Sequence, residues 1–530
     1  MKLRWVWAVL AVLLVGGLWL HFRRHRHPNT PLKTAYWYWQ TPYSLSEQDA
    51  ADLKKLDVKQ IFVRAGTFSS DGQNMVLIIP QSYTQGSNRL PIHLVFNADA
   101  GVIHHFEDYD LNRITNQIST RIAAQVEAAR KVGDKVIGVQ LDFDIPTRLL
   151  PKYADLVRGI RQSNLLFARQ KGFFFSLTGL LSWLGTGGVE RLSSEVDFMI
   201  PQAYEGEVGL TPDKARPLFD PDDLRRRLPK AERLNCPYWI GIPAYGRAFL
   251  YDEAGHLRNS YRGLEAQDAL RHPSFKLVEA YASDPTGKPA IGPSNWVGEE
   301  ILKFKAVRPA LNGEGLGYTL VYNVPSPDVT AKALQIVDEE RGDGCQGVVI
   351  YRMPEPGSSF TVPLDSIVRT FNKQEVVPKL SFKVSSSQDA LETVESSRKD
   401  IPVDVYLEAE NVGSGSSFVA PDAVDIRLQF DKSGFGDIRL RDFDNVSYAF
   451  GRDEKSEVEA PPNRANILHI RKGFMFPGQK IYCGPIRLLN SGQVRVTIRS
   501  RIRCQSGFSS QETQTPEALI RSGTGVLFDN

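Results

Sequence analysis

Short apolar runs rich in β-branched and aromatic residues alternate with helical segments through residues 34–372 of this chain. Each run has the length of a strand, and amphipathic or polar segments separate one run from the next. Strands that alternate with helices in this way form a parallel sheet, and eight such units can close into a ring. The eight runs are residues 35–39, 60–64, 92–97, 136–144, 173–178, 196–200, 238–245 and 347–353. The sequence therefore predicts an α/β fold, a (β/α)8 TIM barrel.

Two further regions depart from this alternation. Residues 246–325 separate the seventh run from the eighth and predict an insertion before the last barrel strand, with a strand of its own at 316–322. Residues 377–530 contain short alternating strands between Gly, Ser, Pro and Asn turns, which predicts an all-β sandwich. Cys483 and Cys504 lie in neighbouring strand-like runs of this region, where either a disulfide or two free thiols is compatible with the pattern.

The N-terminal residues 1–27 contain an uncharged apolar segment, Trp5 to Leu20, between basic flanks. Its length is close to that of a membrane-spanning helix, and Trp residues lie near both ends. Because no small-residue cleavage site comes after it, we expect an uncleaved transmembrane signal anchor. The larger basic cluster, His21 to His27, favours a cytoplasmic body, whereas single anchors of this kind usually export the domain behind them. We expect a single-pass membrane protein whose main body is periplasmic or otherwise extracytoplasmic.

The composition excludes some classes of function. A net charge of +3, with no large basic tract beyond the N-terminus, gives no indication of a nucleic-acid partner. The four Cys residues lack metal-ligand spacing, and the adjacent His104 and His105 would point to opposite faces of a strand. We therefore expect neither a metal site nor another cofactor.

The fourth run, V-I-G-V-Q-L-D-F-D, ends in two acidic residues, Asp142 and Asp144. Side chains at positions i and i+2 of a strand lie on the same face, so we expect the two carboxyl groups to be neighbours. Neighbouring carboxylates raise the pKa of at least one of them, and barrel enzymes carry their catalytic residues at the carboxyl ends of strands. The pattern favours a general-acid site over a role in the turn, where Asp is also common.

Four segments resemble motifs of family 18 glycoside hydrolases, the chitinase-like barrels. Residues 138–144 are similar to the signature D-G-x-D-x-D-x-E, with Asp142 at the last aspartate and Asp144 at the catalytic glutamate. Gln140 stands where the family has its middle aspartate, and Ile137 where it has the first. The resemblance covers residues 34–370. The whole chain also resembles a bacterial family of membrane-anchored barrels with a β-rich tail, in the same broad glycosidase-like group.

The other three segments follow in the family's order. Q-A-Y-E, which contains Gln202, Tyr204 and Glu205, resembles M-x-Y-D on the sixth strand. G-I-P-A-Y-G-R, which contains Tyr245 and Arg247, is similar to G-x-P-x-Y-G-R on the seventh. The eighth run contains Tyr351, near where the family usually has the Trp beneath the sugar.

The resemblance implies a substrate-assisted reaction, in which an acetamide group of the substrate attacks the anomeric carbon. Asp144 would be the general acid, Asp142 its partner, and Tyr204 the donor to the acetamide. The resemblance and the strand ends together imply that substrate contacts come from Gln140, Gln202, Glu205, Tyr245, Arg247, Tyr351, Asn97 and Tyr38. Each tyrosine could instead serve as packing at the barrel end.

The departures from the family motif leave two hypotheses. Asp144 is one methylene shorter than glutamate, and Gln140 cannot ionise. The first hypothesis is a glycoside hydrolase that acts on an envelope or extracellular polysaccharide or glycoconjugate, including a conventional two-carboxylate enzyme with Glu205 opposite Asp144. The second is a catalytically inactive barrel that serves as a glycan-binding or protein-binding scaffold of the envelope.

Overall fold

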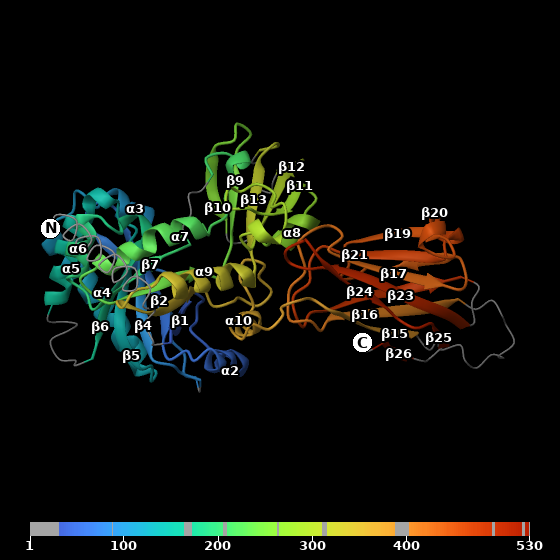
Figure 1. Cartoon of the computed structure of the whole chain (residues 1–530), viewed down its shortest axis with the longest axis horizontal. Coiled ribbons are helices and arrows are strands. Elements are labelled where there is room, and N and C mark those ends of the chain that lie inside the picture. The colour runs from blue at the N-terminus through green and yellow to red at the C-terminus, as the bar shows by residue number, and fades with distance from the viewer. Residues whose placement is uncertain are drawn as a thin grey trace, which may run out of the picture.

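A computed structural model shows the chain as a barrel, an antiparallel sheet that projects from it, and a β-sandwich (Figure 1). The structure describes residues 31–86, 88–163, 172–204, 209–261, 264–309, 315–386, 402–489, 493–521 and 525–528. The predicted N-terminal anchor lies outside these residues. Within them, no helix is both long and apolar enough to span a membrane.

Eight parallel strands form a closed ring, because the last strand pairs with the first. In chain order they are β1 (Lys33–Tyr38), β2 (Ile61–Ser70), β4 (Ile92–Ala98), β5 (Val136–Asp142), β6 (Phe174–Leu180), β7 (Phe198–Gln202), β8 (Tyr238–Pro243) and β14 (Cys345–Tyr351). A ninth strand, β3 (Met75–Ile78), pairs antiparallel with β2 outside the ring. The predicted (β/α)8 barrel is confirmed.

Helices cover the outside of the ring. They are α2 (Glu47–Lys55), α3 (Ala100–His104), α4 (Leu111–Lys131), α5 (Leu150–Gln162), α6 (Gly187–Ser193), α7 (Pro221–Arg227), α9 (Pro327–Glu340) and α10 (Leu364–Phe371). The longest, α4, buries Ile114, Ile118, Ile122 and Val126, which recur at helical spacing. The strands are consequently buried on both faces, against helices outside and against one another within the ring.

The predicted insertion forms a five-stranded antiparallel sheet between β8 and α9. Its strands are β9 (Arg247–Tyr251), β10 (Leu257–Tyr261), β11 (Phe275–Ala282), β12 (Glu299–Ala306) and β13 (Thr319–Pro325), in the order β10-β9-β13-β12-β11. One short helix, α8 (Ala266–Arg271), accompanies them. The strand expected at 316–322 is β13, which begins three residues later.

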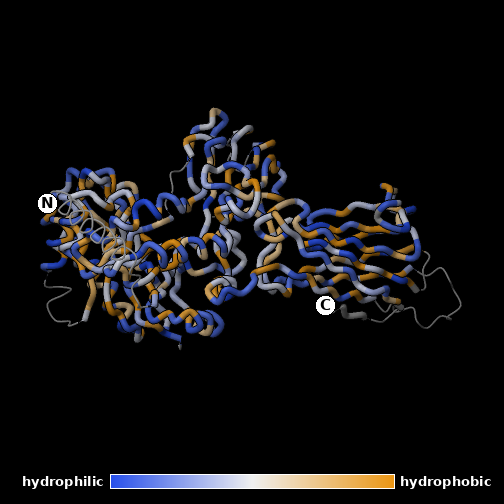
Figure 2. Tube along the Cα trace, viewed as in Figure 1, coloured by the Kyte–Doolittle hydropathy of each residue, from blue (hydrophilic) through white to orange (hydrophobic). Residues whose placement is uncertain are grey.

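The C-terminal region is a sandwich of two antiparallel sheets around one apolar core. The first sheet contains β15 (Leu380–Ser386), β16 (Val403–Asn411), β18 (Phe435–Ile438), β22 (Lys480–Leu488) and β26 (Gly525–Phe528). The second contains β17 (Val424–Phe430), β19 (Asn445–Phe450), β20 (Val458–Glu459), β21 (Ile467–Lys472), β23 (Gln493–Arg503), β24 (Ser510–Gln514) and β25 (Ala518–Arg521). Apolar and polar residues alternate along many of these strands (Figure 2), as expected for sheets with one buried face. Cys483 and Cys504 are both free thiols.

Two consecutive glutamates of β12 join the insertion to the other parts. The Glu299 carboxylate accepts hydrogen bonds from the backbone N–H groups of Leu218 (2.8 Å) and Phe219 (2.9 Å), in the segment after β7. The Glu300 carboxylate accepts one from the N–H of Val419 in the sandwich, at 3.1 Å. Burial raises the pKa of Glu299 to about 7, although its hydrogen bonds act in the opposite direction. Burial also holds the pKa of Glu300 well above its ordinary value.

Candidate active site

Asp142 ends β5 at the carboxyl edge of the barrel and is held by two neighbouring strands. Its Oδ1 accepts hydrogen bonds from the Thr178 hydroxyl of β6 (2.6 Å) and from the Gln202 side-chain amide of β7 (2.9 Å). The three side chains meet because parallel strands end at the same edge of the sheet. Asp142 remains partly exposed, whereas Thr178 and Gln202 are buried.

Asn97 extends this polar group to the other side of Asp142. Asn97 of β4 is the register partner of Asp142, and its Oδ1 accepts a hydrogen bond from the Thr67 hydroxyl of β2 at 2.9 Å. Asn97 is also partly exposed. Five consecutive strands of the ring, from β2 to β7, therefore present one polar side chain each at the same end of the barrel.

Asp144 lies just beyond the end of β5 and is exposed to solvent. Between the two acids, the buried Phe143 ring stacks on Tyr153 of α5, with ring centroids 6.0 Å apart. Burial holds the pKa of Tyr153 well above its ordinary value, and the negative charges of Asp142 and Asp144 raise it further. Both carboxylates thus lie within electrostatic range of one buried hydroxyl.

Aromatic side chains occupy the opposite part of the barrel end. Tyr204, just after β7, stacks face to face on Tyr351 of β14, with centroids 5.0 Å apart and planes at 11°. Tyr245, just after β8, contacts Tyr351 edge-on at 4.6 Å, and Trp39 does so at 5.3 Å. Trp37 completes this aromatic cluster from within the ring. All except the partly exposed Trp39 are buried.

The insertion packs on the aromatic cluster. Phe249, Tyr251, Ile301 and Val321 of its sheet belong to the same buried group as the three tyrosines. The Arg247 guanidinium lies over the Tyr245 ring, 5.4 Å from its centroid. The insertion therefore covers the end of the barrel near β7, β8 and β14, whereas Asn97, Asp142 and Asp144 on the other side retain contact with solvent.

Gln140 does not lie where a substrate could touch it. It is fully buried one layer below Asp142, where its Oε1 accepts a hydrogen bond from the Trp37 indole at 2.9 Å. Its amide donates to the Ser176 hydroxyl at 3.2 Å. The expected substrate contact of Gln140 is replaced by a structural role, in which it satisfies polar groups inside the barrel.

Tyr38 is also remote from the polar group. Successive residues of a strand point to opposite faces, and on β1 the inward positions are Ala35 and Trp37. Tyr38 consequently belongs to the outer core, where its hydroxyl donates to the carbonyl oxygens of Ser44 (2.9 Å) and Pro42 (3.1 Å). Its predicted substrate contact does not agree with this position. Glu205 lies outside the described residues.

Sequence reasoning missed Thr178, Thr67 and Trp39. Thr178 had a detectable signal, because it follows Ser176 at a spacing of two in the otherwise apolar run F-F-F-S-L-T. Such alternation places both hydroxyls on the face that points into the ring. Thr67 lies in a part of β2 that extends beyond the predicted run, so no comparable signal marked it.

One family model matches the chain, at residues 107–273, under the description "Domain of unknown function (DUF3142)". This match includes the Asp142 segment. No curated protein matches.

Among the solved structures that are similar to this chain are a spore cortex-lytic enzyme and two chitinases. The spore cortex-lytic enzyme SleL of Bacillus megaterium shares 10% identity, with 66% of this chain and 76% of that chain covered and a TM-score of 0.40. A family GH18 chitinase from Chromobacterium violaceum shares 10%, with 91% of each chain covered and a TM-score of 0.36. The class V chitinase of Nicotiana tobaccum shares 13%, with 64% and 99% covered and a TM-score of 0.37. The barrel itself is established by its strand pairing.

Proposed function

We propose that this chain is a glycoside hydrolase that acts on a polysaccharide or glycoconjugate of the cell envelope or its surroundings. One arrangement carries the proposal: Asp142, fixed by Thr178 and Gln202, is followed two residues later by the exposed Asp144, at the end of the barrel that also carries the aromatic cluster. Acidic groups accept hydrogen bonds from sugar hydroxyls, and Trp39, the one partly exposed ring named in the cluster, offers a flat partner for the apolar face of a sugar.

Asp144 is the general acid in this proposal and gives its proton to the glycosidic oxygen. Its exposure lets a bound sugar approach a carboxyl group that is one methylene shorter than glutamate. The resemblance to family 18 assigns Asp142 and Tyr204 to the acetamide of the substrate. The hydrogen bonds from Thr178 and Gln202 support that role, since they fix the orientation of the Asp142 carboxylate before any substrate binds.

One observation favours the second hypothesis, a glycan-binding barrel without hydrolysis. Where the resembled motif has a carboxylate below Asp142, this chain has Gln140 in a neutral hydrogen-bonded group with Trp37 and Ser176. A neutral amide does not ionise, so it cannot raise the pKa of Asp142 as a second carboxylate would. The glycosidase hypothesis therefore requires that Asp142 and Asp144 act without a third acid beneath them.

Hydrolysis of a panel of fluorogenic glycosides and soluble glycans distinguishes the two. The full chain is compared with Asp144→Asn and with Asp57→Asn, a matched control because Asp57 is exposed near the opposite end of the barrel. Turnover that is lost in Asp144→Asn and kept in Asp57→Asn supports the glycosidase. Equal turnover in all three proteins would show that the reaction does not need Asp144. Glycan binding without any turnover supports the scaffold.

The site of action is a proposal as well. Residues 1–27 supply a single membrane anchor, and the barrel and the sandwich lie on the extracytoplasmic side. The apolar segment Trp5 to Leu20 supports this assignment. Membrane fractionation, followed by protease treatment of intact cells, tests it: a protein that stays soluble, or a body that is protected while a periplasmic marker is digested, contradicts it.

A further inference from the structure

The outer face of the second sandwich sheet contains a cavity of about 510 Å³. Strands β17, β21, β23 and β24 supply its walls through side chains that point away from the apolar core. Its charged lining residues are Asp425, Arg427, His469, Arg499, Arg501 and Glu512. The volume falls within the range of sites that take small ligands or single units of a polymer.

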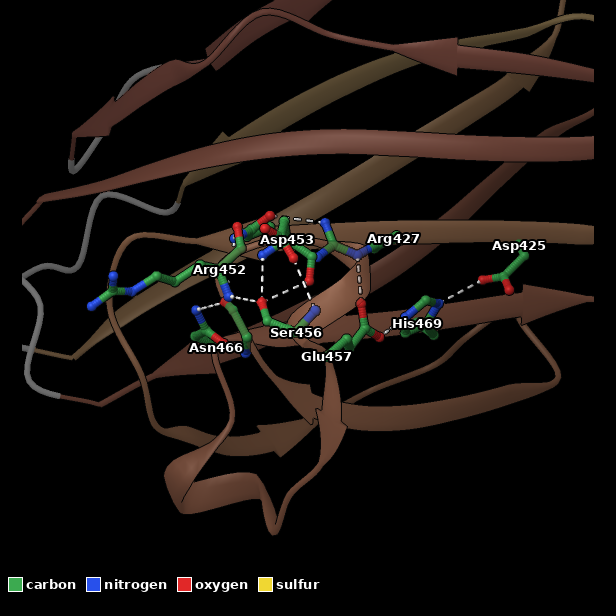
Figure 3. Close-up of polar contacts among 10 residues, drawn as sticks. Asp425, Arg427, Arg452, Asp453, Ser456, Glu457, Asn466 and His469 are labelled. Atoms are coloured by element: carbon green, nitrogen blue, oxygen red, sulfur yellow. Dashed lines mark hydrogen bonds and ion pairs between the residues drawn. The ribbon is translucent and has the colours of Figure 1, made fainter.

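A hydrogen-bonded network fixes one wall of the cavity (Figure 3). The two ring nitrogens of His469 face Asp425 Oδ1 at 3.1 Å and Glu457 Oε1 at 2.5 Å. Arg427 donates from Nε to the other oxygen of Glu457 at 3.0 Å. A carboxylate faces each ring nitrogen, and this arrangement favours the protonated imidazole, which donates from both nitrogens. The hydrogen bond to Asp425 is the largest cause that raises the pKa of His469.

Arg427 is built into this wall with an unused donor. Only 5% of the residue is exposed, and its Nη1 donates to Gln429 Oε1 at 2.9 Å. Its Nη2 is buried and has no hydrogen-bond partner among the residues that the structure describes. A buried guanidinium nitrogen without an acceptor is unfavourable, so an anionic oxygen placed in the cavity could satisfy it.

Positive groups outnumber negative ones when the lining is counted with its direct ion-pair partners. Six groups can carry a positive charge and four a negative one: Arg427, His469, Arg471, Arg499, Arg501 and Arg503 against Asp422, Asp425, Glu457 and Glu512. Asp425 is already engaged by His469 and by Arg471, at 3.3 Å. The surplus charge selects an anion, and guanidinium groups bind carboxylates through paired N–H donors.

We propose that this cavity binds a carboxylate-bearing sugar unit of an acidic polysaccharide. The arginines would take the carboxylate, and the outward-facing Glu512 and Gln514 of β24 would accept from and donate to ring hydroxyls. Nucleic acid fits less well, because no described Phe, Tyr or Trp lines the cavity for base stacking and the two carboxylates repel phosphodiesters. The proposal does not depend on hydrolysis by the barrel.

Calorimetric binding of polygalacturonate to the full chain tests this proposal, beside the same polymer with its carboxyl groups reduced. Arg499→Gln and Arg501→Gln are the test variants. Arg495→Gln is the matched control, because Arg495 shares the strand and its outward face but does not line the cavity. Binding should weaken at least tenfold in each test variant and less than twofold in the control, and the reduced polymer should not bind.

Several results would overturn the proposal. They are equal binding of the reduced polymer, an equal loss in Arg495→Gln, and no binding of polygalacturonate at all. Tighter binding of single-stranded DNA would assign the cavity to nucleic acid, and binding of dextran sulfate alone would replace the carboxylate with a sulfate. The Arg501 side chain is 43% exposed and its ion pair with Asp422 lies at the surface, so its substitution should change the thermal midpoint little and separate lost binding from lost folding.

Discussion

The side-chain amide of Gln202 reaches across the end of β6 and donates a hydrogen bond to Asp142 over 2.9 Å. Thr178, on the strand between them, donates to the same oxygen over 2.6 Å. One oxygen atom of Asp142 therefore connects three consecutive strands of the barrel. Hydrogen bonds to a charged acceptor are stronger than neutral ones, so this small group bears on both stability and the proposed chemistry.

Thr178→Val removes one of the two donors to Asp142 with little change in shape. We expect a loss of about 1.5–3 kcal/mol in the free energy of unfolding, because the hydrogen bond is to a charged group. Turnover should fall on the order of tenfold, which corresponds to about 1.4 kcal/mol of transition-state stabilisation. Denaturant unfolding and steady-state kinetics measure the two effects. Thr67→Val is the matched control, since Thr67 bonds to Asn97 instead. If both variants lost turnover equally, Asp142 would have no special position.

The variant Gln140→Leu distinguishes a structural role of Gln140 from a contact with the substrate. The substitution leaves the buried Trp37 indole N–H without its acceptor, which should cost about 1–3 kcal/mol in the free energy of unfolding. Because Gln140 is fully buried, the KM for any substrate should stay within about twofold of the original value. Chemical unfolding and kinetics measure both quantities. A large rise in KM without a loss of stability would restore the predicted substrate contact.

His469 makes the stability of the sandwich depend on pH. Its pKa is raised, so its contribution is fully present below about pH 6.5, the ordinary value, and is lost as pH rises through the raised value. Burial raises the pKa of Asp425 and of Glu457, but their hydrogen bonds and nearby positive charges outweigh burial and lower it. Those contributions are present above the ordinary carboxyl values and are lost as pH falls through the lowered ones.

The variant His469→Gln tests this dependence. Thermal unfolding from pH 4 to pH 9 should show the largest deficit of the variant between the carboxyl values and about pH 6.5, and a shrinking deficit at higher pH. His104→Gln, at an exposed position, is the matched control for the change of side chain. A deficit of His469→Gln that stayed constant over the whole range would contradict the assignment.

Glu300→Gln should stabilise the protein at high pH. Burial holds the pKa of Glu300 above its ordinary value, so ionisation favours the unfolded chain. Its contribution is therefore most favourable below about pH 4.5 and is lost as pH rises toward the raised value. A glutamine cannot ionise and can still accept from Val419, so the advantage of the variant should grow between pH 4 and pH 8. Glu279→Gln, at an exposed position of the same sheet, is the control. If Glu300→Gln were no more stable than the original protein at pH 8, burial would not be opposing the ionisation of Glu300.

The sequence predicted the barrel well because each strand was a separate apolar run with its own turn signals. It could not predict which side chains of β1 point inward. A strand that is buried on both faces has no polar side, so the sequence does not show which alternate residues face the inside of the ring. Tyr38 and Trp37 were therefore indistinguishable before the structure. Gln140 is a second case: its partner Trp37 is 103 residues away, and no local pattern indicates that a buried amide is already satisfied. The length of β5 is a third case, because the strand ends at Asp142 and the predicted run ended at Asp144.

The neighbouring positions of Glu299 and Glu300 make β12 sensitive to register. Successive side chains of a strand point to opposite faces, which is how one carboxylate meets Leu218 and Phe219 of the barrel region while the next meets Val419 of the sandwich. A slip of β12 by one residue would exchange the two faces and break both attachments together. Insertions or deletions of a single residue within this strand should therefore be tolerated far less than substitutions, and far less than length changes in the loops of the inserted sheet.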